Sequence, residues 1–129
     1  MYHRLFLDYD DVDLEWVLMD VERLVRLCPK LGKAIILQSS EGHYHVRFMR
    51  ARLTWDEVVG LFFASTAHRG FVKFSIEVGS ATLRLSSKGK EKHAPIYIGT
   101  YDPDRGFYYD EYTAMMLKSL PRSIRIYKD

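Results

Sequence analysis

The sequence has few of the features that mark secreted, membrane-spanning or zinc-binding proteins. Its single cysteine, Cys28, excludes an internal disulfide and a cysteine-rich zinc site. No apolar run approaches the ~20 residues that a membrane-spanning helix needs. The opening residues 1–4 lead directly into a strand pattern, so we expect no signal peptide. We therefore expect a cytoplasmic protein, which includes the host cytoplasm if the chain belongs to a virus or plasmid.

The composition is typical of one soluble globular domain spanning residues 1–129. Apolar residues make up 47% and charged residues 28% of the chain, and the net charge is only +2. The charges are unevenly spread, because residues 8–22 are acidic and residues 84–93 are basic. An acidic cluster and a basic segment in one domain would suit a metal beside a phosphate-bearing ligand, and two solvated patches are the simpler alternative.

The clearest secondary structure signals lie in the first half of the chain. Apolar residues recur at helical spacing over residues 14–28, with Asp13 placed to cap the helix and Asp20 on its polar side. Residues 34–38 and 43–48 are rich in branched and aromatic side chains and flank a Ser-Ser-Glu-Gly turn. This pattern predicts a hairpin.

A capping box at Thr54 and Glu57 predicts a second helix that ends near residue 65. The chain beyond it has shorter signals, and residues 71–77 fit either a helix or a strand. The remaining predicted elements are a strand over 81–87, a strand over 95–101, a turn over 102–106, a helix over 108–117 and a strand over 124–127.

This order of elements predicts an α+β sandwich, with helices on one face of a mainly antiparallel sheet. Strand alternation places apolar residues toward the helices and polar residues on the opposite, open face. If the strands are neighbours, several chemically active side chains meet on that open face. They are Asp8, Asp10, His43, His45, Arg47 and Arg84.

The first strand carries the most informative pattern, an apolar run that ends in carboxylates. Alternation puts Asp8 and Asp10 on one strand face, about 7 Å apart. Two such carboxylates are costly to bury unless a cation neutralises them, and hard cations such as Mg²⁺ or Mn²⁺ prefer carboxylate oxygens. The alternative is a strand that ends in a solvated acidic turn, with Asp11 or Asp13 capping the helix.

Three short motifs in this order resemble the archaeo-eukaryotic primase superfamily, in its small archaeal and viral form. Leu5–Asp10 resembles the first motif, apolar residues followed by Asp-x-Asp. Ile36–Val46 resembles the second motif, a serine-containing hairpin turn leading to a histidine. Leu83–Lys88 resembles a late Leu-Arg-Leu-Ser-x-Lys run. The resemblance covers about residues 4–100 and implies a sheet modified from the RNA-recognition motif.

The resemblance implies a domain for DNA replication that binds a nucleoside triphosphate and a DNA or RNA strand, with replication proteins as partners. It implies Mg²⁺ or Mn²⁺ on Asp8 and Asp10, with His45 contacting the nucleotide. The family's third metal-binding carboxylate is replaced here by His68, which leaves nucleotidyl transfer open. The phosphate and nucleotide contacts would come from Ser39, Ser40, His43, Arg47, Arg84 and Lys88.

A second interpretation starts from His43-Tyr44-His45, a His-hydrophobic-His triplet on one strand. Rolling-circle replication initiators use such a histidine pair to bind a divalent metal, while a tyrosine attacks the DNA phosphodiester. Their sheet is also of the RNA-recognition type, so the fold does not separate the two enzymes. The candidate nucleophiles are Tyr108, Tyr109 and Tyr112.

A third interpretation is a single-stranded nucleic-acid binder without catalysis. Exposed aromatic residues such as Tyr44 or Tyr97 would stack on bases beside arginines. The near-neutral net charge argues against strong nonspecific binding of this kind.

Overall fold

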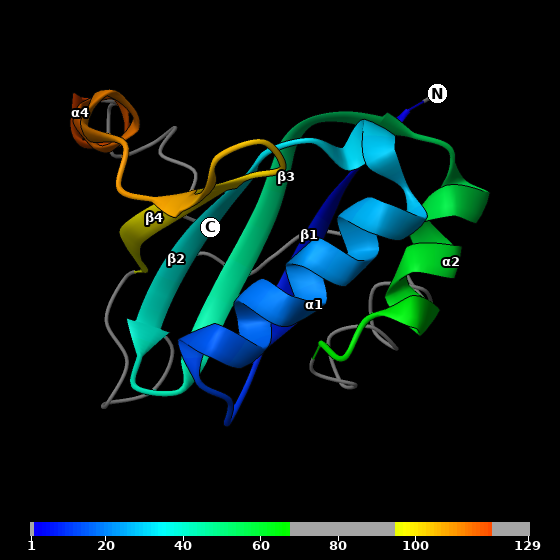
Figure 1. Ribbon diagram of the computed structural model, residues 1–129, viewed down its shortest axis with the longest axis horizontal. Coiled ribbons are helices and arrows are strands. Elements are labelled where there is room, and N and C mark those ends of the chain that lie inside the picture. The colour runs from blue at the N-terminus through cyan, green and yellow to red at the C-terminus, as the bar shows by residue number, and fades with distance from the viewer. Residues whose placement is uncertain (1, 68–94, 120–129) are drawn as a thin grey trace.

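A five-stranded antiparallel sheet organises the molecule in the computed structural model, which describes residues 2–67 and 95–119 (Figure 1). The strand order is β1-β3-β2-β4-β5. The strands are β1 (His3–Tyr9), β2 (Ala34–Ser40), β3 (His43–Leu53), β4 (Ile96–Asp102) and β5 (Gly106–Tyr108). The helices are α1 (Leu14–Leu27), α2 (Trp55–Ala64) and α4 (Glu111–Ser119), with a 3-10 turn at Pro29–Leu31. The predicted α+β class is confirmed.

The first three strands form one unit around β3. Both β1 and β2 pair antiparallel with β3, so they run parallel to each other and α1 provides the crossover between them. This arrangement is a split β-α-β unit. The predicted hairpin is confirmed, and Gly42 adopts a φ of 79° in its turn.

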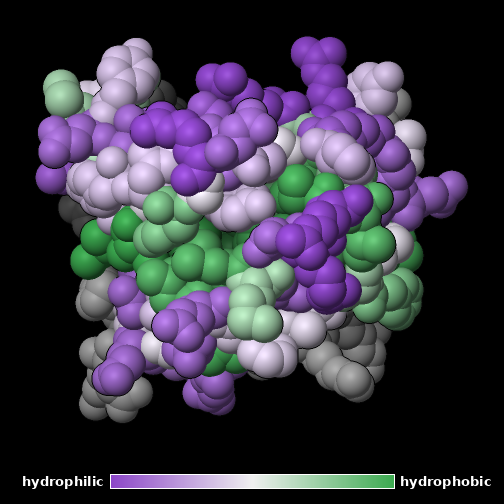
Figure 2. Space-filling model, viewed as in Figure 1, coloured by the Kyte–Doolittle hydropathy of each residue, from purple (hydrophilic) through white to green (hydrophobic). Residues whose placement is uncertain are grey.

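The helices α1 and α2 lie in front of the sheet and cover one of its faces (Figure 1). Alternation turns Leu5, Leu7 and Tyr9 of β1 toward these helices, and none of the three is exposed to solvent. Their helical neighbours include Val17 and Val21 of α1. The outer surface on this side is mixed, with an apolar band between polar regions (Figure 2).

Helix starts follow the local sequence signals. The side chain of Asp13 accepts a hydrogen bond from the Trp16 amide and caps α1 as predicted. The capping box at the start of α2 is also present, with Thr54 and Glu57 each accepting from the other's amide. Such caps satisfy amides that the first helical turn leaves without partners.

Helix α4 departs from the expected one-sided arrangement. Its Ala114 and Leu117 pack with Leu37 and Tyr97, and alternation turns Leu37 away from the core under α1. Helix α4 therefore covers part of the face that was expected to be open. It also begins later than predicted, because Tyr108 belongs to strand β5.

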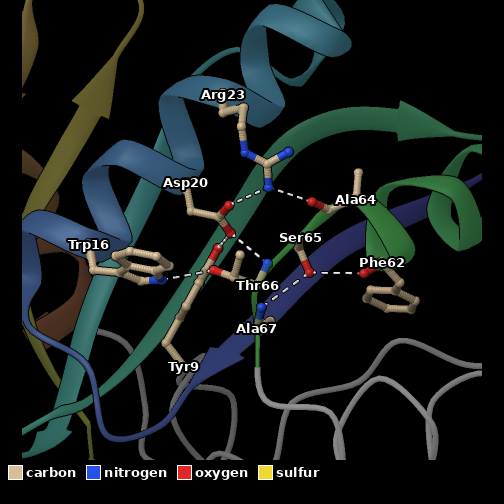
Figure 3. Close-up of polar contacts among 9 residues, drawn as sticks. All are labelled: Tyr9, Trp16, Asp20, Arg23, Phe62, Ala64, Ser65, Thr66 and Ala67. Carbon is tan, nitrogen blue, oxygen red and sulfur yellow. Dashed lines mark hydrogen bonds and ion pairs between the residues drawn. The ribbon is translucent and has the colours of Figure 1, made fainter.

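A buried polar network joins α1, β1 and the segment after α2 (Figure 3). Its centre is Asp20, which the sequence pattern placed on the polar side of the helix but which is buried. The carboxylate of Asp20 accepts hydrogen bonds from the Tyr9 hydroxyl at 2.6 Å and from the Thr66 amide at 3.0 Å. Arg23 bridges the same carboxylate to the carbonyl of Ala64.

Several predictions fall on residues that the structure does not describe. They are the elements proposed for 71–77, 81–87 and 124–127, and the candidate residues His68, Arg84 and Lys88.

Candidate metal centre

The antiparallel register of β1 and β3 brings acidic residues and histidines together. Asp8 lies directly opposite His45, and its Oδ1 is 3.8 Å from the imidazole Nε2. At the end of β1, Asp10 Oδ1 contacts Nδ1 of His43. Two acid–histidine pairs therefore follow one another along one face of two neighbouring strands. The expectation that these four side chains converge is confirmed, while their roles stay predictions.

A backbone contact holds the end of this site together. The Val12 amide donates a hydrogen bond of 3.2 Å to the Gly42 carbonyl, which joins the acidic turn to the hairpin turn. Asp11 lies between them in the left-handed region, with a φ of 58°. Aspartate tolerates this conformation better than most residues because of its short polar side chain. The turn thereby directs Asp11 toward its neighbours, against simple strand alternation.

Three of these residues form a candidate metal-binding set. Ligand atoms of Asp10, Asp11 and His43 lie within 4.8 Å of one another. An ion at about 2.1 Å from each ligand spans roughly 4.2 Å between opposite ligands, so a small side-chain movement would close the set around one ion. Carboxylate oxygens suit Mg²⁺ and Mn²⁺, whereas an imidazole suits divalent transition metals such as Zn²⁺. The donor set therefore fits a divalent cation.

The composition of this set differs from the predicted pair of Asp8 and Asp10. Asp10 belongs to it, whereas Asp8 contacts His45. Asp11 was missed as a ligand because alternation assigns it to the opposite face and because an aspartate before a helix is a common cap. The cap is Asp13 instead. The missed signal was the pair of consecutive aspartates directly after β1, of which Asp11 is the second, across from a glycine turn.

The side chain of Arg47 places a buried positive charge on the same face. Its guanidinium lies over the ring of Phe6, with Cζ 4.1 Å from the ring centre, and only 7% of the residue is exposed. Phe6 is also its cross-strand partner. Burial lowers the pKa of Arg47 to about 10, so the side chain stays charged at neutral pH.

The hairpin serines occupy different environments. Ser40 pairs with His43 across the turn, and the register shifts between Gln38 and Ser40. Ser39 lies within this irregularity and is buried. Of the two predicted phosphate-binding serines, Ser40 is therefore next to the metal-binding set along the backbone.

The two tyrosines that were predicted to stack on bases are buried. Tyr44 and Tyr97 are 7% and 8% exposed, so the prediction that either is an exposed stacking residue is wrong. Tyr44 faces the core under the helices, and Tyr97 packs beneath α4. Tyr109 and Tyr112 are exposed instead, at 54% and 70%.

No protein family model matches the sequence, and no curated protein or solved structure matches it. Among the helices of residues 2–67 and 95–119, none is long and apolar enough to cross a membrane.

Proposed function

We propose that this domain binds a divalent metal through Asp10, Asp11 and His43 and uses it to bind the phosphates of a nucleotide and a nucleic-acid strand. The observation that carries the proposal is the convergence of two acid–histidine pairs and Asp11 at one end of the β1–β3 ladder. The order of motifs along the chain supports a primase-like domain of DNA replication, with metal-dependent nucleotidyl transfer as its reaction.

Each residue has a role that its position allows. A bound Mg²⁺ or Mn²⁺ would supply Lewis-acid stabilisation of phosphate oxygens. Asp8 and His45 form the next pair along the same face, where the buried imidazole would orient the carboxylate of Asp8. Arg47 adds a fixed positive charge from the adjacent position on that face of β3.

The proposal is tested first by metal binding, independently of catalysis. Titration with Mn²⁺, followed by the loss of the free-ion electron paramagnetic resonance signal, should give one site in the wild type. Asp10→Asn should weaken that site at least tenfold, because it removes a charged ligand shared by the set. Asp104→Asn, in the exposed β4–β5 turn, is the matched control and should bind normally. Equal Mn²⁺ affinity in the two variants would refute the metal site.

The second test concerns the reaction. With Mn²⁺ and a labelled nucleoside triphosphate, the wild type should extend or initiate a strand on a single-stranded template, and Asp8→Asn and Asp10→Asn should both abolish the product. If Asp8→Asn keeps full activity, the Asp8–His45 pair has no part in the chemistry.

A second candidate function, a His-hydrophobic-His nickase, has its own supporting observation. The two histidines share one face of β3, and α4, which carries Tyr112, packs on that same side of the sheet through Ala114 and Leu117. The nickase would leave a labelled single strand covalently attached to Tyr108, Tyr109 or Tyr112. Such an adduct, located by mass spectrometry, would replace the primase-like proposal.

A further inference from the structure

We propose that Tyr109 stacks on a base of a single-stranded nucleic acid whose phosphates are bound near Asp8 and His45. This inference rests on the proposed function and names its substrate as single-stranded. The stacking position lies at the end of a row of side chains that crosses the sheet from the acid–histidine pairs.

The strand registers define this row. Asp8 of β1 lies opposite His45 of β3, His45 lies opposite Leu37 of β2, and Leu37 lies opposite Tyr97 of β4. Residues directly opposite each other in a sheet project from the same face. His45 and Tyr97 are two strand spacings apart, which is roughly 10 Å. A short run of nucleotides can therefore reach both ends of the row.

Tyr97 fixes the position of Tyr109 at the end of this row. The Tyr97 hydroxyl accepts a hydrogen bond of 3.1 Å from the Asp110 amide and is 2.6 Å from Oγ1 of Thr100. The rings of Tyr97 and Tyr109 are tilted against each other, with centres 5.3 Å apart. Tyr109 is thus an exposed ring, 54% accessible, on a buried and hydrogen-bonded support. A ring held in this way loses little freedom when a base stacks on it.

The surroundings of Tyr109 indicate stacking rather than charge attraction. The two residues that follow it, Asp110 and Glu111, are acidic, so they add no attraction for phosphates. Stacking on an aromatic ring needs only the face of an unpaired base, which a duplex keeps inside its base stack. Helix α4 covers Leu37 in the middle of the row and Tyr97 at its end, so the strand would pass beside the start of α4.

The experiment measures binding of a labelled oligothymidine by fluorescence anisotropy in the presence of Mn²⁺. Tyr109→Ala should weaken binding by roughly 5- to 150-fold, the range expected for one lost base stack. Tyr109→Phe should bind like the wild type, because it keeps the ring and loses only the hydroxyl. Tyr2→Ala is the matched control, since Tyr2 is also an exposed tyrosine but precedes β1 at the strand end away from Asp8.

Further measurements separate stacking from the metal site. Tyr109→Ala should leave Mn²⁺ affinity unchanged, and the dependence of binding on salt should keep its slope, because no phosphate contact is lost. A duplex of the same sequence should bind wild type and Tyr109→Ala equally. Oligothymidine binding that is unaffected by Tyr109→Ala, or absent in the wild type, overturns the stacking proposal. The Mn²⁺ titration of Asp10→Asn then tests the metal site independently of the stacking proposal.

Discussion

Replacing Asp20 by alanine should destabilise the fold more than any change on the outer face of α1. The substitution removes the buried carboxylate that accepts from the Tyr9 hydroxyl at 2.6 Å and the Thr66 amide at 3.0 Å. It also removes the partner of Arg23. We expect a loss of about 3–5 kcal/mol in the free energy of unfolding, the range for removing one partner from a buried charged network.

The components of the network explain this magnitude. A hydrogen bond to a buried charged group contributes about 1.5–3 kcal/mol, and two such bonds are lost. The Arg23 side chain is about half exposed, so its ion pair adds at most about 1 kcal/mol. Relief from burying the carboxylate offsets part of the total. Asp20→Asn keeps one acceptor oxygen and should cost less than Asp20→Ala.

Urea denaturation followed by circular dichroism measures the effect, with the slope of the linear extrapolation checked for each variant. The matched control is Glu22→Ala, two positions after Asp20 on the same helix. It removes an exposed i,i+4 ion pair between Glu22 and Arg26. That change should cost only about 0.3–0.5 kcal/mol. If Asp20→Ala and Glu22→Ala differ by less than about 1 kcal/mol at equal slopes, the network does not stabilise the fold as argued.

Three further predictions concern other features of the described residues. Burial, followed by the charge and hydrogen bond of Asp20, raises the pKa of Tyr9 well above its usual value of 10. The unfolded chain therefore loses this proton first, so stability should be full below pH 10 and fall above it, and Tyr9→Phe should flatten that part of a pH–stability curve. Thr54→Ala should cost about 1 kcal/mol in urea titrations, whereas Thr54→Ser should be nearly neutral. Gly42→Ala should cost about 1–2 kcal/mol of stability because of the positive φ at this position. The added Cβ would lie 3.6 Å from the nearest atom, Val12 O, so a clash would not contribute to that cost. Gly42→Asn should cost less than Gly42→Ala, and equal losses in the two variants would contradict the conformational explanation.

The elements that the sequence predicted correctly are those with local or periodic signals. The cap at Asp13, the capping box at Thr54 and the hairpin over 34–48 depend on residues a few positions apart. Asp20 could not be assigned in this way, because the Thr66 amide that it binds is 46 positions away in the chain. A charged residue near the boundary of a helix's apolar stripe is normally solvated, and only tertiary contacts decide otherwise.

The candidate site shows the same division between alternation and tertiary geometry. Alternation correctly placed Asp8 and Asp10 on one face with His43 and His45, because period two is a property of any strand. It failed for Asp11, whose positive φ reverses the direction of its side chain. The sequence pattern also failed to show which sheet face α4 covers, because this helix has apolar residues around most of its surface.

The buried network and the candidate metal centre depend on the same strand register. A shift of one residue between β1 and β3 would turn Asp8 and Asp10 into the core and move Leu7 out of it. Tyr9 lies between the two carboxylates in sequence, and its hydroxyl is held by Asp20 on the opposite face of the sheet. The hydrogen bond that fixes Tyr9 therefore also fixes the direction of the carboxylates on either side of it. A variant that weakens the Tyr9–Asp20 contact while the protein stays folded, such as Tyr9→Phe, should consequently lower Mn²⁺ affinity without altering any proposed ligand. Unchanged Mn²⁺ affinity would show that the bond from Val12 to Gly42 is sufficient to hold the acidic strand in place.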